Sequence, residues 1–333
     1  MTIRKAYSIL RFVKDIICMT KISVIIPTKN QKEYIGRCLD SVLAQKGPFE
    51  LEVLVGDDHS DDTTAEVVKK YAATDSRIRL FVWESSYGAT RNVYELCCKM
   101  SGDYFAYLEG DDYWLDENKL QKQLDFLEKN PHYVACFHDI CLIDEQGTPL
   151  NKKLAWITRK RTVTYRNFDG YHLPGHSSTW LRRNCYPEHA EMLRSIYQVH
   201  PQIGDRTAAL CFLSIGKFGR IKNTLSCYRY VRAEKAQNNT SQFFPVGGNS
   251  VLIEKELLDK LQALSISLGR TKDFMQRRYV LFAKALVFAI INPSVENKTT
   301  LKTIFQSCKY KLFAILEMPF ILLHLVYLKF FRA

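Results

Sequence analysis

Short apolar runs alternate with segments of helical hydrophobic period from residue 22 to about residue 137. The runs are rich in β-branched residues and predict strands, while the intervening segments predict helices. The predicted strands are 22–26, 51–56, 78–83, 104–108 and 134–137, and the predicted helices are 33–45, 63–73, 89–100 and 120–129. Pro27 is expected to end the first strand. Such alternation is typical of an α/β fold of Rossmann type, a mostly parallel sheet flanked by helices.

Two adjacent aspartate pairs, Asp57-Asp58 and Asp111-Asp112, directly follow two of these predicted strands. The carboxyl ends of parallel strands are where open α/β sheets bind ligands. Adjacent carboxylates raise one another's pKa unless a cation or hydrogen-bond donors neutralise them, and oxygen ligands suit Mg²⁺ or Mn²⁺. Solvated turn aspartates are the alternative. Two pairs after two strands favour a metal-dependent site for a phosphate-bearing ligand.

Composition narrows the class of protein. The chain has 333 residues, is 47% hydrophobic, and carries a net charge of +12. It contains no long Lys/Arg block and no zinc-finger spacing, so we expect no nucleic-acid partner and favour an anionic membrane surface or an acidic substrate. Its ten cysteines lack a Cys-x-x-Cys pair, which predicts reduced thiols in a cytoplasmic protein.

The order of the motifs resembles the amino-terminal half of family 2 glycosyltransferases. The matching segments are SVIIPTKN at 23–30, LDSVLAQ at 39–45, EVLVGDDHSDDT at 52–63, GATRN at 88–92, GDY at 102–104 and EGDDYW at 109–114. The resemblance covers residues 22 to about 140 closely and weakens toward residue 235. It implies a GT-A fold, a nucleotide-sugar donor, Mg²⁺ or Mn²⁺ as cofactor, and inversion at the anomeric carbon.

Carried over by position, the resemblance implies a set of donor-binding residues. Pro27 and Asn30 would belong to the loop beside the nucleotide, Asp58 would hydrogen-bond the base, and Arg91 would lie near the diphosphate. Lys29 stands where many relatives place an aromatic residue, which leaves base stacking open.

The second acidic motif carries the remaining donor contacts. The resemblance places Asp111 at the nucleotide and Asp112 at the metal. Glu109 stands where relatives usually have aspartate, and its role is left open.

An inverting transfer also needs a general base and a place for the acceptor. Asp205, in the segment IGDR at 203–206, lies where the family keeps its base and precedes an apolar helix predicted at 207–214. The alternative for Asp205 is a helix cap. His176 falls in the expected acceptor region and is a candidate acceptor contact, although a lone histidine is more often a loop or core residue.

The chain is expected to divide into four parts: an extension at 1–21, a donor half at 22–140, an acceptor half at 141–235 and a helical region at 236–333. Residues 1–18 would be an amphipathic helix on a membrane or would precede the native start at Met19. Apolar residues and lysines at 311–331 favour a helix lying on anionic lipid. The alternative is a helical cap packed on the catalytic domain or on a second copy.

The predicted function is a hexosyltransferase-like glycosyltransferase of surface polysaccharide biosynthesis, cytoplasmic and peripheral at the inner face of the membrane. Its acceptor would be a saccharide or a lipid-linked saccharide. A processive synthase is disfavoured because no Gln-x-x-Arg-Trp segment occurs, and a nucleotidyltransferase because the first loop lacks glycines. A non-catalytic nucleotide-sugar-binding or scaffold protein of the same fold is the remaining alternative.

Overall fold

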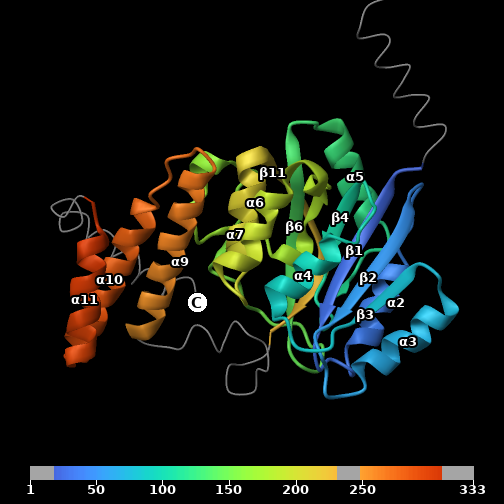
Figure 1. Cartoon of the computed structure of the whole chain (residues 1–333), viewed down its shortest axis with the longest axis horizontal. Coiled ribbons are helices and arrows are strands. Elements are labelled where there is room, and N and C mark those ends of the chain that lie inside the picture. The colour runs from blue at the N-terminus through green and yellow to red at the C-terminus, as the bar shows by residue number, and fades with distance from the viewer. Residues whose placement is uncertain (1–18, 231–247, 310–333) are drawn as a thin grey trace, which may run out of the picture.

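Residues 19–230 and 248–309 are described by the computed structural model, and the alternation expected from the sequence is confirmed (Figure 1). The first half runs β1 (Lys21–Thr28), α2 (Ile35–Leu43), β2 (Glu50–Asp57), α3 (Thr64–Thr74), β3 (Ile78–Val82), α4 (Ala89–Cys97), β4 (Tyr104–Tyr107), β5 (Tyr113–Trp114), α5 (Lys119–Lys129) and β6 (Tyr133–Ile143). The membrane-surface segments expected within 1–18 and 311–331 lie outside the described residues.

The second half adds short strands and five helices within the described ranges. These are β7 (Ile157–Thr158), β8 (Thr162–Val163), β9 (Leu173–Pro174), β10 (Leu181–Arg183), α6 (Tyr186–Val199), α7 (Asp205–Ile215), β11 (Lys217–Arg229), α9 (Gly248–Ser267), α10 (Met275–Ile291) and α11 (Val295–Ser307). Strand order in the main sheet is β3-β2-β1-β4-β10-β6-β11-β5, with β8 paired to β11. The strands β3, β2, β1 and β4 are mutually parallel, whereas β10 is antiparallel to both β4 and β6.

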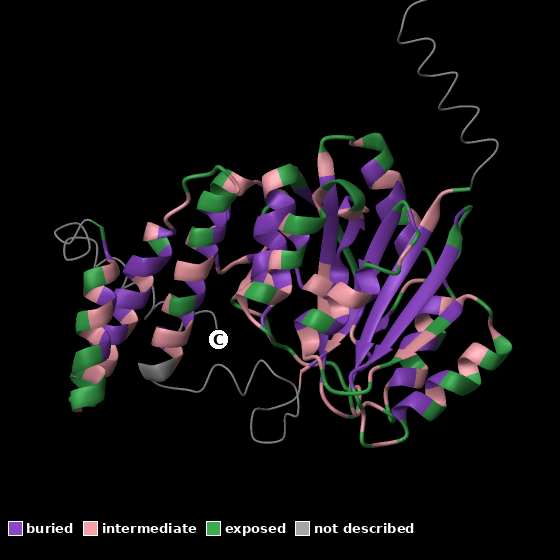
Figure 2. Ribbon diagram, viewed as in Figure 1, coloured by how far each residue is buried: buried purple, intermediate pink, exposed green. Residues whose placement is uncertain are grey.

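Alternate residues of β1 supply two separate cores. Ile22, Val24 and Ile26 face α2, α3 and α5, while Ile25 faces α4, α6 and α7. All four side chains are fully buried. Burial of such a side chain stabilises the fold by about 1.5–3 kcal/mol, so the alternation fixes which face of the sheet each helix covers. The central strands β1 and β2 are buried at every residue after the first (Figure 2).

Pro27 does not end the first strand, contrary to the sequence-based expectation. The strand β1 continues to Thr28, and Pro27 pairs in register with Gly56 of β2. The sheet uses the carbonyl of Pro27, which accepts from the Gly110 amide at 3.2 Å. Proline lacks only the backbone N–H donor, so the pairing of β1 with β2 continues through Pro27.

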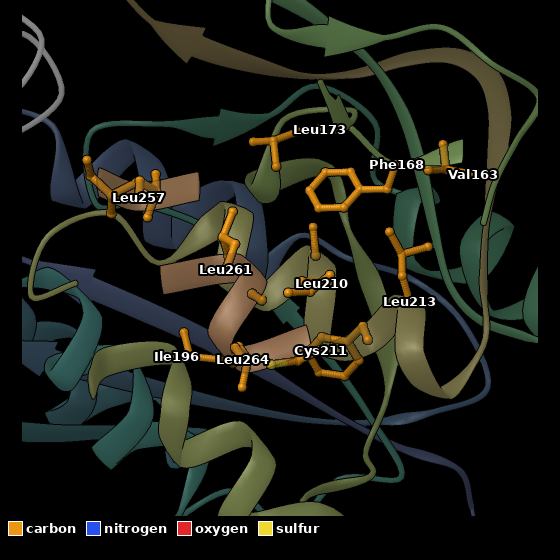
Figure 3. Close-up of a cluster of buried hydrophobic side chains, with 14 of the residues drawn as sticks. Val163, Phe168, Leu173, Ile196, Leu210, Cys211, Leu213, Leu257, Leu261 and Leu264 are labelled. Atoms are coloured by element: carbon orange, nitrogen blue, oxygen red, sulfur yellow. The ribbon is translucent and has the colours of Figure 1, made fainter. Parts of the chain in front are cut away.

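The helix α9 packs on the sheet domain through a row of leucines. Leu257, Leu261 and Leu264 lie beside Leu210 and other side chains of α6 and α7 (Figure 3). The helices α10 and α11 then pack on α9, which places all three at one end of the molecule. For residues 248–309 the structure therefore shows a helical cap, and no described helix is long and apolar enough to cross a bilayer. The division into domains stays a prediction.

Candidate active site

A cavity of about 1090 Å³ opens at the carboxyl ends of β1, β2 and β4. The loops after these strands form one wall, α4 and the start of α7 form another, and α9 and α10 close the far end. Lining residues from these elements include Pro27, Lys29, Asn30, Asp58, Thr90, Glu109, Asp111, Asp205, Glu254 and Lys284. The cavity therefore joins segments that are up to about 250 residues apart in sequence.

Side-chain hydrogen bonds tie the loops after β1 and β2 together. The amide of Asn30 donates to Ser60 Oγ at 2.9 Å, and Asn30 Oδ1 accepts from the Asp61 amide at 2.8 Å. Asn30 and His59 both adopt left-handed backbone conformations, with φ of 53° and 60°. Asn30 is among the residues that most readily tolerate such values. Its side chain joins the two loops at the cavity wall. The family resemblance implies that this residue lies beside the nucleotide.

Asp58 lines the cavity and organises the loop before α4. Its carboxylate accepts from Ser86 Oγ at 2.8 Å, the Tyr87 amide at 2.6 Å and the Gly88 amide at 3.1 Å. Asp57 accepts from the Ser60 amide at 2.8 Å and supports the neighbouring turn. Both acids of the first pair are thus held by hydrogen-bond donors, as loop-positioning residues are.

The acidic turn, defined as residues 109–112, brings three carboxylates together. Glu109 and Asp111 line the cavity. Asp112 is 1% exposed and lies behind them, where its Oδ1 accepts the Arg229 amide at 2.9 Å. Gly110 lies close to its neighbours, since a Cβ there would lie 2.5 Å from Gln31 Oε1 and 2.8 Å from Thr28 Oγ1. The turn therefore aims Glu109 and Asp111 at the cavity and leaves Asp112 behind it.

Burial and mutual repulsion make these acids unusually weak. Burial, with the charge of Asp111, raises the pKa of Glu109 to about 7, and burial raises the pKa of Asp111 to about 6. The pKa of Asp112 is raised well above its usual value by burial and by Asp111 and Glu109. The pKa values are raised by desolvation and by repulsion between the carboxylates, and a bound cation would relieve both effects.

A divalent cation fits this turn on the chemistry of its donors. Asp111 Oδ1 and Asp112 Oδ2 are buried and accept no hydrogen bond from any described residue. Within 19–230 and 248–309, however, no three His, Cys, Asp or Glu side chains gather as a metal site. A Mg²⁺ site built from one or two carboxylates and substrate phosphates matches both observations.

Asp205 begins α7 and lines the same cavity. Its Oδ1 accepts the Arg206 amide at 2.7 Å, and burial raises the pKa of the Asp205 carboxyl. Its charge contributes to the raised pKa of Glu109, which lines the same cavity. Asp205 is the first-turn acid of α7, and its bond to the Arg206 amide satisfies one of the free backbone donors at the start of that helix.

His176 also lines the cavity, between two aromatic rings. Its ring centroid lies 4.2 Å from that of Tyr228 and 5.6 Å from that of Trp156. The ring is 6% exposed, and burial lowers the pKa of His176 to about 3. The three rings form an aromatic wall whose planes are tilted by 37° and 51° from that of His176. Trp156 and Tyr228 were missed by sequence reasoning.

Arg91, like Asp112, is a predicted site residue that does not line the cavity. Its guanidinium lies 4.1 Å from the Tyr87 ring centroid and 3.5 Å from Glu95 Oε1, and the side chain is 48% exposed. Its neighbours Thr90 and Asn92 face inward instead, because a helix turns about 100° per residue. Lys29, Arg206 and Lys284 are basic residues that do line the cavity, and the last two were missed by sequence reasoning.

Comparison with known proteins places residues 23–186 within the model of Glycosyl transferase family 2. An uncharacterized protein of Mycobacterium tuberculosis is 36% identical over 126 residues, which is 38% of this chain and 36% of that protein. TuaG of Bacillus subtilis, named as a proposed teichuronic acid biosynthesis glycosyltransferase, is 33% identical over 43% of this chain and 55% of its own. The chain thus spans less than two-thirds of the length of these relatives.

Solved structures share the fold. Staphylococcus aureus TarS in complex with UDP-GlcNAc superposes with a TM-score of 0.59 at 16% identity, over 86% of this chain and 80% of that chain. This match confirms the GT-A-like fold expected from the sequence.

Proposed function

Residues 23–186 belong to Glycosyl transferase family 2, and from that premise we propose that the protein moves a sugar from a nucleotide-diphosphate donor to a saccharide or lipid-linked saccharide, with inversion at the anomeric carbon. One observation carries the proposal beyond family membership. A single cavity contains Asp58 and the acidic turn on one side and Asp205 on the other. Donor-binding and proton-accepting groups therefore face the same space.

Asp205 is proposed as the general base that removes the proton of the attacking acceptor hydroxyl. A base must reach that proton and must have a pKa suited to the working pH. Asp205 lines the cavity and its pKa is raised from the ordinary value by burial. The aromatic wall of His176, Trp156 and Tyr228 would hold the acceptor sugar by its apolar ring face.

Asp111 is proposed to hold Mg²⁺ or Mn²⁺, with Glu109 beside it. The cation supplies positive charge to the leaving diphosphate. Asp112, the aspartate expected at the metal, has one oxygen occupied by the Arg229 amide and does not line the cavity. We therefore assign Asp112 to positioning of the turn. Pro27, Asn30 and Asp58 are proposed to frame the nucleotide.

The relatives suggest the donor and the product to try first. TarS is solved with UDP-GlcNAc, and TuaG is named for teichuronic acid biosynthesis. We propose a uridine diphosphate sugar as donor and a bacterial surface polysaccharide as product.

A peripheral membrane position is part of the proposal and has its own test. Ile290, Ile291 and Val295 are 69%, 76% and 82% exposed at the turn between α10 and α11, an arrangement that suits contact with a lipid surface. Vesicles of phosphatidylglycerol should carry the protein in flotation, and the Ile291→Ser, Val295→Ser variant should float less. Equal flotation of the wild type and the variant would contradict the proposed contact of this turn with the membrane.

The function is tested by titrating purified protein with UDP-, GDP- and dTDP-sugars in the presence of Mn²⁺, Mg²⁺ or EDTA, with donor hydrolysis followed in parallel. We expect one nucleotide class to bind in a metal-dependent way and to be hydrolysed slowly. Failure of every nucleotide sugar to bind under every condition would overturn the proposal. Binding without turnover in any acceptor screen would favour the non-catalytic alternative.

A further inference from the structure

Five side chains form a buried charged group at the end of the cavity away from the acidic turn. We call it the Tyr171 cluster, and its members are Tyr171, Arg206, Glu254, Arg277 and Lys284. Arg206 and Tyr171 come from the sheet domain, whereas Glu254 belongs to α9, and Arg277 and Lys284 to α10. All but Arg277 line the cavity.

Tyr171 lies at the centre of the three cations. The Arg277 guanidinium carbon is 3.3 Å from its ring centroid, that of Arg206 is 4.7 Å away, and Lys284 Nζ is 5.8 Å away. Cations over the face of an aromatic ring are attracted to it. The ring thus holds three positive groups close together that would otherwise repel one another.

Glu254 is the carboxylate that pairs with this group. It forms an ion pair with Arg277 Nε and lies 4.0 Å from Arg206 Nη1. Asp205, next to Arg206 in sequence, is a second carboxylate whose charge interacts with that of Arg206. Counted with it, three cations face two carboxylates, and one positive charge is left over. Arg277 is 5% exposed, and its Nη2 has no hydrogen-bond partner within residues 19–230 and 248–309.

Buried positive charge of this kind is costly unless an anion compensates it. The cost is visible at Lys284, whose pKa is lowered by burial first and by Arg277 next. Packing α9 and α10 against α7 needs no such excess, since the leucines of α9 already supply that contact. The excess charge is explained if the cavity end receives a negatively charged group.

The position of the cluster indicates which reactant brings that group. Arg206 directly follows Asp205, the proposed base, so the cluster begins beside the place of the attacking hydroxyl. The opposite end of the cavity contains Glu109 and Asp111, which suit a diphosphate only together with a cation. The two ends therefore differ in sign, and the cationic end is on the acceptor side.

We propose that the Tyr171 cluster binds a phosphate or carboxylate group that the acceptor carries close to its reacting hydroxyl. The acceptor is then an anionic glycan or a phosphate-linked one, selected against neutral sugars by charge. This inference rests on the proposed function, because it assigns the acceptor end of the same cavity.

The test uses the full chain with its nucleotide half filled by UDP and Mn²⁺. Glycerol 3-phosphate and glucuronate are titrated by calorimetry, with glycerol and glucose as neutral counterparts. We expect the anionic probes to bind and the neutral ones not to bind. Tighter binding of one of the two anions would show whether the acceptor group is a phosphate or a carboxylate. In Lys284→Met and in Arg206→Met the dissociation constant should rise about tenfold or more, as expected for loss of a charged hydrogen-bond partner.

Two controls make the result specific. Lys298→Met removes one exposed lysine from α11 and should leave anion binding unchanged. UDP affinity, measured separately in each variant, shows that the variant is folded. Equal anion affinity in wild type and Lys284→Met, or no anion binding by protein that binds UDP, would overturn the inference and leave the proposed function intact. Protein that binds the anions but no nucleotide sugar would overturn the proposed function and the acceptor assignment with it.

Discussion

The backbone amide of Arg229 donates a hydrogen bond of 2.9 Å to Oδ1 of Asp112, across 117 positions of sequence. Arg229 Nε also donates to the Asp111 carbonyl at 3.1 Å. The end of β11 thereby fixes the acidic turn at the end of β4. We therefore propose different roles for the two adjacent aspartates: Asp112 holds the turn in place, and Asp111 faces the cavity.

Asparagine substitutions separate these two roles. Asp112→Asn keeps an oxygen for the Arg229 amide and removes a repelling charge, so metal-dependent nucleotide affinity should change less than about threefold. Asp111→Asn should weaken it by about tenfold or more, since a charged oxygen ligand is lost. Titration of each variant with the donor in Mn²⁺ and in EDTA measures both. A larger loss of affinity in Asp112→Asn than in Asp111→Asn would indicate that Asp112 is the metal ligand.

Asp205→Asn should lower kcat by about 10²–10⁴-fold, as loss of a general base does, while donor affinity stays unchanged. The same substitution weakens the favourable first-turn charge of α7 by about 0.3–1 kcal/mol. Steady-state kinetics and urea unfolding are therefore measured together. Loss of stability with kcat retained would leave Asp205 with a helix-terminus role only.

Arg91→Ala should change nucleotide affinity less than about twofold, because the guanidinium lies on Tyr87 outside the cavity. Lys29 is the matched comparison. It lines the cavity, its Nζ donates to Ser86 Oγ at 2.9 Å, and Lys29→Ala should weaken binding severalfold. A tenfold loss in Arg91→Ala would instead support the diphosphate contact that the family resemblance implies.

His176 should make the protein less stable in acid. Burial lowers the pKa of His176 to about 3, against about 6.5 in an unfolded chain. Between these values the unfolded state binds a proton that the folded state does not, so the stability contributed by neutral His176 is complete above pH 6.5 and is lost as pH falls toward 3. Urea unfolding from pH 7 to pH 4 should show a shallower decline in His176→Asn than in wild type. The exposed His132→Asn serves as control, and equal slopes in all three proteins would contradict the prediction.

Local patterns were enough to predict the donor half. The apolar run at 104–108 predicted β4, and the EGDD segment after it predicted an acidic site. The parallel strands in front of it required that Asp58 and Asp111 reach the same edge of the sheet. Both lie on the cavity wall. These inferences succeed because strand period, helix period and turn residues act over only a few neighbouring positions.

The position of each side chain within that edge could not be read from sequence. The motif at 109–112 offers three acids, and only the folded structure shows that Glu109 and Asp111 line the cavity while Asp112 does not. The motif at 88–92 likewise offers a basic residue, and the packing of α4 shows that Arg91 faces outward. Both outcomes depend on which neighbour occupies each side of a residue, and such contacts join distant segments.

Sequence patterns alone were sufficient to predict the α/β class, the alternation of the longer strands and helices up to residue 137, and the resemblance to family 2, although they missed the two-residue strand β5. They carried no information that β10 enters antiparallel between β4 and β6, or that α9 and α10 bring Glu254 and Lys284 to the cavity of the sheet domain. A hydrophobic period in the sequence indicates that a helix has an apolar face. The surface it covers is chosen by the shape and area of the other faces in the folded chain.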